Sequence, residues 1–251
     1  MTEDVRGGAF SPRDASVVIS RASFTDVEIH RRAFDQFIVI GASFAGCRFR
    51  STTFRNGSFG ELRQGTPQSR YVDCTFEDVR IQRGMWPDNA RFEHCRFLDS
   101  MITGWRASHA EFIDCTFTGQ LRDCWFMGTT ARAMYPQREQ NEFKGNDFSG
   151  ADIVASQFDY GIDVMAQEWP SGPRYVILDQ LHARVAAARA AISRWPDDED
   201  REYALLNLNV LSDEGMANQD AQIVRRDEWM PAKPHLRDLF FQLLDDDLHP
   251  S

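Results

Sequence analysis

The sequence predicts a mainly β protein, a solenoid that turns a corner every five residues, followed by an α-helical tail. Two observations predict this fold. Large apolar residues recur every five positions over most of the first 160 residues, and small residues recur two positions before them. An α-helix repeats its apolar face every 3.6 residues and a β-strand every second residue, so neither can hold this pattern. The chain must therefore bend after each five-residue step.

The period is most regular between Ile19 and Phe59, where nine consecutive central positions are apolar. It restarts at Tyr71, slips by one residue after Trp86 and resumes at Phe92. At the central position stand 15 of the 19 phenylalanines, and all five cysteines stand at the small position. Burial of each central Phe contributes roughly 1.5 to 3 kcal/mol, so a core is a sufficient reason for them. We expect the cysteines to be inert, inward-facing thiols.

Several five-residue segments carry a resemblance to a known family. The segments CTFED, CRFLD, CTFTG, NDFSG and ADIVA resemble the pentapeptide-repeat consensus of a small residue, a polar residue, Leu or Phe, and two polar residues. The resemblance covers roughly residues 15 to 160 and implies a right-handed quadrilateral β-helix of about six coils. Four repeats would then form one coil, so residues 20 apart, such as Phe97 and Phe117, would stack. The expected organisation is a lead-in over 1–14, the β-helix over 15–160 and a C-terminal α-helical region over 161–251.

Many residues two positions after a central residue are Gly, Asn or Asp, which tolerate tight turns. Corner geometry explains them, and an acidic recognition surface is a second interpretation that can hold at the same positions. On the 20-residue register Asp73 and Asp114 share one corner column, and Asp78 and Asp99 share the next. Arg80, Arg91 and Arg96 dilute the charge there. The predicted acidic ridge consists of Asp73, Glu77, Asp78, Glu93, Asp99 and Asp114.

Two insertions interrupt the period. The step from Phe59 to Tyr71 is twelve residues and the step from Phe126 to Phe143 is seventeen. Loops on a rigid scaffold often carry function, although long insertions are also tolerated by accident. In number and approximate size the insertions resemble the two loops of Qnr-type quinolone-resistance proteins, where loops help to protect DNA gyrase. The candidate binding residues in the loops are Arg63, Gln64, Arg132, Tyr135 and Arg138.

Helical spacing replaces the five-residue period in the tail. Apolar residues three and four apart predict one helix from Leu178 to Trp195, a second is expected from Asp198 to Ser212, and a third from about Pro234. Each apolar face must be buried, either against the open C-terminal end of the β-helix or in a dimer interface. The sequence therefore leaves a monomer and a homodimer open.

The sequence offers little that indicates chemistry. It contains no nucleophile elbow, phosphate-binding glycine loop or metal-ligand spacing, and we expect His30, His94 and His109 to point outward without a second ligand. We therefore predict no enzyme, no catalytic residues, no metal and no cofactor. An odd number of cysteines without a CxxC pair fits a reducing compartment. With no long apolar run, the expectation is a cytoplasmic protein that does not contact membranes.

The net charge and its distribution along the chain help to choose between the possible functions. A net charge of −10 argues against direct binding to nucleic acid or to an anionic membrane. The Qnr-type resemblance implies a DNA-mimic β-helix that occupies the DNA-binding surface of a type II topoisomerase. Residues 1–160, however, hold 21 acidic and 19 basic residues, a net of −2, whereas residues 161–251 hold 17 and 9, a net of −8. We therefore predict a non-enzymatic module that binds another protein through its β-helix faces and loops. The alternative is a DNA-mimic modulator or protector of DNA gyrase that confers antibiotic resistance or self-resistance.

Overall fold

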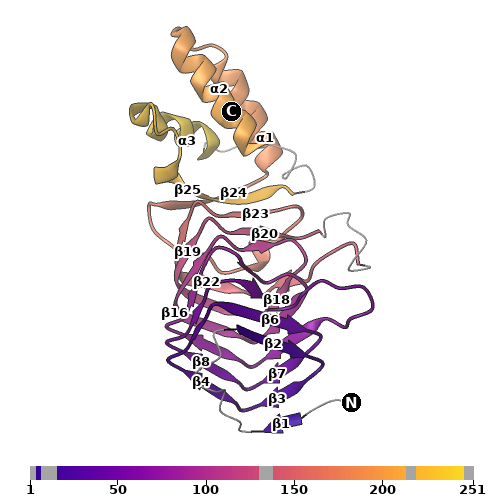
Figure 1. Cartoon of the computed structure of the whole chain (residues 1–251). Helices are drawn as coiled ribbons and strands as arrows, with labels where there is room; N and C mark the ends of the chain where they lie inside the picture. Colours follow the sequence, from indigo (N-terminus) through magenta and orange to yellow (C-terminus); the bar gives the residue numbers. More distant parts are fainter. Residues whose placement is uncertain (1–3, 7–15, 130–137, 213–218, 246–251) are drawn as a thin grey trace. The chain divides into compact units, whose positions relative to one another are not determined.

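The computed structural model contains two compact units (Figure 1). The β-helix unit comprises Met1–Phe158 and Ala166–Pro170, and the helical unit comprises Asp159–Met165 and Ser171–Ser251. The structure describes residues 4–6, 16–129, 138–212 and 219–245.

The β-helix unit is built from short strands that all pair in parallel, as a coiled chain requires. One face is a seven-stranded sheet, here called sheet A. Its strands, in order, are β1 (Asp4–Arg6), β3 (Ser23–Thr25), β7 (Ser43–Ala45), β11 (Ser69–Val72), β15 (Ala90–Glu93), β18 (Glu111–Ile113) and β21 (Phe143–Lys144).

The sheet that follows sheet A along each coil runs around a corner and covers two faces. It contains β4 (Glu28–His30), β8 (Arg48–Arg50), β12 (Thr75–Glu77), β16 (Arg96–Thr103), β13 (Arg80–Ile81), β9 (Thr53–Phe54) and β5 (Ala33–Phe34), joined by β19 (Thr116–Arg122) and β22 (Asp147–Val154). The remaining face has two short sheets. They are formed by β2 (Ser16–Ser20), β6 (Gln36–Ile40), β10 (Gly57–Ser58) and β14 (Met85–Trp86), and by β17 (Arg106–Ala107), β20 (Trp125–Met127) and β23 (Gln157–Asp159).

The interior confirms that residues 20 apart stack. Phe97 pairs in register with Phe117, and their rings lie parallel with centroids 4.8 Å apart. The one-residue slip appears as Phe76 over Phe97, 21 positions apart, with centroids 4.6 Å apart. All fifteen central phenylalanines are buried, none more than 8% exposed. The five-residue period therefore builds one continuous aromatic core.

The cysteines line the same interior. All five are buried and free, and Cys47, Cys74, Cys95 and Cys115 follow one another in a single column. The Cys95 thiol donates a hydrogen bond to the Tyr71 carbonyl oxygen at 3.3 Å. Burial raises the pKa of Cys95 above its usual range and that of Cys124 to about 11. The Cys95 and Cys124 thiols therefore stay protonated at neutral pH and act as small core residues.

Two irregular repeats keep the core filled in ways that the period does not predict. Trp86, expected at a central position, is only half-buried, whereas Met85 is fully buried and pairs with Gly57. The extra residue that causes the one-residue slip in the period therefore lies before Met85 and not after Trp86. In the next coil Ala107 holds the central position and Trp105 the small one, and both are buried. The exchange of large and small residues keeps the volume of the core similar in this coil.

The last ring stack of the β-helix unit is covered by residues from beyond residue 160. The Trp169 ring lies parallel to Phe148 with centroids 5.0 Å apart, and Asp147 forms a parallel bridge with Glu168. The backbone N–H of Gly145 donates to the Ala166 carbonyl. The segment that contains η1 (Val164–Ala166) thus leads into a final partial coil.

The helical unit has a core of its own. Strand β24 (Tyr175–Asp179) pairs antiparallel with β25 (Ala221–Arg225), and the described residues that follow β24 also form three helices and two short 3₁₀ turns. They are α1 (Leu181–Ile192), α2 (Asp198–Leu211), η3 (Arg226–Glu228), η4 (Pro234–Leu236) and α3 (Arg237–Asp245). None of the helices in the described part of the chain is long and apolar enough to cross a membrane.

One helix prediction is wrong at its start. Leu178 lies in β24 and not in the first helix, because Gln180, in the left-handed conformation with φ 48°, separates the strand from α1. The second helix begins at Asp198 as predicted, and the Asp197 carboxylate accepts a hydrogen bond from the Asp200 N–H at 2.8 Å. The apolar faces of all three helices contribute to the core of the unit. Capping of the β-helix and dimerisation through the tail stay predictions.

Candidate binding site: the loop-bearing edge

One corner of the β-helix repeats without interruption. It carries the column Asp26, Gly46, Asp73, His94, Asp114 and Gly145, here called the aspartate corner, where every residue is left-handed with φ between 51° and 63°. Each N–H in the column donates to a carbonyl of the following coil, as Asp73 does to Glu93 at 3.0 Å. Asp and Gly are favoured here because they adopt the left-handed conformation at the lowest cost.

The structure places the four aspartates of the predicted acidic ridge in two neighbouring corner columns. Asp73 and Asp114 flank His94, whose Nδ1 lies 3.7 Å from Asp73 and whose Nε2 lies 3.5 Å from Asp114. Asp78 and Asp99 follow each other in the next column. All four side chains stand at the surface. Within the described ranges, no group of three or more His, Cys, Asp or Glu side chains is arranged as metal ligands would be.

Arginines neutralise the two glutamates of the ridge. Arg50 Nε lies 2.8 Å from Glu77, while Glu93 is paired with Arg70 at 2.7 Å and with Arg91 at 2.5 Å. The sequence predicts that Arg91 reduces the negative charge of the ridge, but it does not identify Arg50 and Arg70. The ridge is therefore less acidic than its six carboxylates suggest.

Both insertions leave the β-helix at one other corner, the one that leads into sheet A. The first connects β10 to β11 and the second connects β20 to β21. In the first two coils the same corner is made in two residues, by Arg21 and Ala22 or by Gly41 and Ala42, and after β14 and β17 it is made in three. We call residues 60–68, 128–129 and 138–142, together with Asn89, Arg91 and Glu111, the loop-bearing edge.

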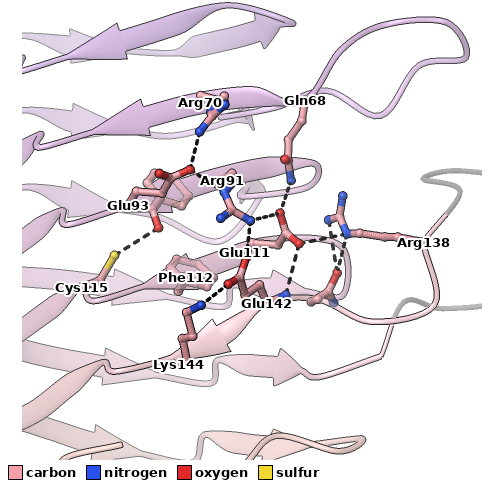
Figure 2. A network of polar contacts seen from close by, with 12 residues as sticks. Gln68, Arg70, Arg91, Glu93, Glu111, Phe112, Cys115, Arg138, Glu142 and Lys144 are labelled. Atoms are coloured by element: carbon pink, nitrogen blue, oxygen red, sulfur yellow. Dashed lines mark hydrogen bonds and ion pairs between the residues drawn. The ribbon is translucent and has the colours of Figure 1, made fainter.

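Glu111 is the meeting point of the two insertions (Figure 2). Its side chain is only 8% exposed. One carboxylate oxygen, Oε2, accepts hydrogen bonds from Gln68 of the first insertion at 2.8 Å and from Arg91 at 3.0 Å. The other oxygen, Oε1, accepts from the Glu142 backbone N–H at 3.2 Å and lies 3.5 Å from Arg138 Nε. A single buried carboxylate thus contacts the ends of both insertions.

Arg138 fixes the second insertion to the two coils that precede it. Its Nη1 donates to Asn89 Oδ1 at 3.1 Å, and its Nη2 donates to the His109 carbonyl. Burial lowers the pKa of Arg138, an effect that Glu111 opposes. His109 was predicted to point outward, but it is buried, because this corner is covered by the insertion. The Arg138 side chain therefore serves as an anchor and is not offered freely to a partner.

The remaining charges of the edge compensate one another. Arg91 contacts Glu93, Glu111 and Glu142, the last at 2.7 Å, and Lys144 also pairs with Glu142 (Figure 2). Hydrogen bonds from Lys144 and Arg91 hold the pKa of the Glu142 carboxyl below its usual range. Such a network fixes positions, because removing any member leaves its partners charged and poorly solvated.

The first insertion folds back on the β-helix. A Cβ on Gly41 would lie 2.9 Å from the Pro67 ring, and the Gly41 N–H donates to Ser69 Oγ at 3.0 Å. Arg63 and Gln64, both predicted binding residues, stay exposed, and Arg63 pairs with its neighbour Glu61 at 2.9 Å. Arg132 and Tyr135 lie outside the described residues.

The sequence does not single out Glu111. It precedes the central Phe112, at a position where polar outward residues are ordinary. The only available signal is its place on the 20-residue register, one coil from Arg91, at the corner where both insertions leave. Gln68 and Asn141 are missed for the same reason, since their partners are 43 and 33 residues away.

Comparison with known proteins assigns no family. No family and no curated protein matches the chain. Among solved structures, it is similar to QnrB1, a plasmid-mediated fluoroquinolone resistance protein. A trypsin-treated form is 14% identical with a TM-score of 0.40, covering 58% of this chain and 78% of that chain. The full-length form is 12% identical with a TM-score of 0.21, covering 68% and 91%. Identities and TM-scores this low assign this chain neither a family nor a function.

Proposed function

We propose that this chain is a non-enzymatic module that binds another protein through its loop-bearing edge, with the β-helix as a rigid support. One observation carries the proposal: two insertions far apart in sequence leave the same corner and converge on Glu111. An accidental insertion needs no anchor, whereas a recognition surface gains affinity when its loops are held in place before binding.

The kind of partner follows from charge. The chain carries −10 overall, so nucleic acid and anionic membranes are disfavoured, and the charges at the base of the insertions already satisfy one another. A protein surface with polar or basic groups fits best. We also propose that the protein is cytoplasmic and needs no metal or cofactor. Its β-helix would be right-handed with about six coils, and the protein would be a monomer or a homodimer.

The test is capture of a partner by the full chain and by two variants. In one, residues 61–66 are replaced by a short glycine linker, and in the other residues 130–137 are. Both variants retain Gln68 and Arg138. We expect the captured protein to be lost from both, while an Asp99→Asn variant at the opposite corner retains it. Unchanged capture by both trimmed variants, with circular dichroism like that of the parent, would exclude the edge as the recognition surface.

A DNA-mimic modulator of DNA gyrase is the second candidate. The observation in its favour is the pair of aspartate columns, Asp73 with Asp114 and Asp78 with Asp99, which place carboxylates on successive coils. Folded protein at micromolar concentration should then alter gyrase supercoiling or relieve fluoroquinolone-stabilised cleavage. Changing all four aspartates to Asn should abolish the effect. No effect of the parent protein in either assay would remove this candidate.

A further inference from the structure

We infer that the two insertions form one cooperative element, in which Glu111 and Asn89 transmit the position of one insertion to the other. The inference rests on the proposed function only in that it describes how the proposed recognition surface is organised. Its evidence is two separate sets of contacts that link the described ends of the insertions.

The first link is the divided Glu111 carboxylate. Oε2 contacts the first insertion through Gln68, and Oε1 contacts the second through the Glu142 N–H and Arg138. A carboxylate can shift to follow one set of donors only by leaving the other set. Because Glu111 is buried, water cannot replace the lost hydrogen bonds at low cost.

The second link is Asn89, which holds both ends of the first insertion. The Asn89 N–H donates to the Gly60 carbonyl at 2.8 Å, and the Asn89 carbonyl accepts from the Ser69 N–H at 3.3 Å. Its side-chain oxygen accepts from Arg138 of the second insertion at 3.1 Å. The coil is packed tightly here, since a Cβ on Gly60 would lie 2.6 Å from the Asn89 carbonyl carbon. A shift of Arg138 would therefore move Asn89 and, with it, the residues at which the first insertion begins and ends.

Two such links make the insertions thermodynamically dependent on each other. Residues in one hydrogen-bond network typically show interaction energies that correspond to several-fold to more than tenfold changes in an equilibrium. Binding of a partner by one insertion would then alter the affinity of the other, and the reverse must hold to the same extent.

Hydrogen exchange on the full chain without a partner tests the coupling. In Arg138→Ala, which alters the second insertion, we expect the amides of Thr66 and Ser69 in and beside the first insertion to exchange roughly tenfold faster. In Gln68→Ala, the amides of Asn141 and Glu142 should respond in the same way. Glu111→Gln keeps the side-chain shape, removes the charge, and should accelerate exchange in both insertions.

The control is Arg63→Ala, which removes an ion pair within the first insertion that does not involve Glu111 or Asn89. It should leave the second insertion unchanged. Amides of the aromatic core near Phe97 should stay protected in every variant and so show that the fold is retained. Unchanged exchange of Thr66 and Ser69 in both Arg138→Ala and Glu111→Gln, with a protected core, would overturn the inference.

Partner binding gives a second readout that separates this inference from the proposed function. If a partner is captured, trimming both insertions should reduce the binding free energy by less than the sum of the two single trims. Additive losses would contradict the inference that the insertions form one cooperative element. If coupled exchange is found but no partner is captured, the inference stands and the proposed function fails.

Discussion

The aspartate corner and the loop-bearing edge are corners of the same coils, but they are stabilised differently. The aspartate corner uses one left-handed residue per coil and backbone hydrogen bonds between coils. At the loop-bearing edge, two coils have a long insertion in place of the short corner, and a buried polar network around Glu111 and Arg138 holds these insertions. A solenoid can therefore carry long insertions where side chains replace the lost backbone contacts. We expect the loop-bearing edge to be more sensitive to side-chain mutation than the aspartate corner, because it depends on those side chains.

The largest expected effect comes from Glu111→Ala. The substitution removes the buried carboxylate that Gln68, Arg91 and Arg138 share, and it leaves the Gln68 amide and the Glu142 N–H without this acceptor. We expect a loss of about 3 kcal/mol in the free energy of unfolding, measured by urea denaturation. A loss below about 0.5 kcal/mol, as for an exposed ion pair, would show that the edge is no more dependent on its side chains than the other corner.

Gly145→Ala tests the aspartate corner and should cost about 1 to 2 kcal/mol. Gly145 has φ 63°, and a Cβ there would lie 2.1 Å from Asp114 Oδ1, so the aspartate must also move. The matched control is Gly65→Ala in the first insertion, at φ 73° with nothing within 4 Å of the added Cβ. Equal losses for both variants in thermal unfolding would contradict a contribution from the Asp114 contact.

The third prediction concerns pH. The folded-state pKa of Glu142 is lowered, so its ion pairs stabilise the protein above the unfolded pKa of about 4.3 and this contribution is lost as the pH falls through the folded-state value. Glu142→Gln should therefore be less stable than the parent at pH 7, by less than about 1 kcal/mol because the group is partly exposed. The two unfolding curves should converge as the pH falls below about 4. A constant difference between them across this range would contradict the assignment.

The smallest effect is expected for Glu77→Ala on the acidic ridge. Glu77 pairs with Arg50 at 2.8 Å, but the two side chains are 42% and 46% exposed. Exposed pairs of this kind contribute about 0.2 to 1 kcal/mol. We expect a change of less than about 0.5 kcal/mol that shrinks further in high salt. A loss comparable to that of Glu111→Ala would remove the distinction drawn between the two regions.

The interior and the aspartate corner could be predicted from sequence because both depend on local repetition. Each coil presents the same inward positions, so the phenylalanine period and the Cys74, Cys95 and Cys115 column follow once the repeat length is known. The positions of Asp73 and Asp114 in one column follow from the same register. Pattern alone misplaced the slip, because it takes the large apolar Trp86 for a central residue, whereas packing places Met85 at the small position opposite Gly57.

By itself, then, the sequence determined the period, the inward residues and the existence of two insertions, since these depend on spacing along the chain. Only the tertiary structure showed that the insertions share one corner and that Glu111 and Asn89 hold both of them. The strand that replaces the start of the first tail helix was decided in the same way, through pairing of β24 with a segment more than 40 residues away. In each case the deciding contact joins residues from different coils or elements, and no local pattern records such contacts.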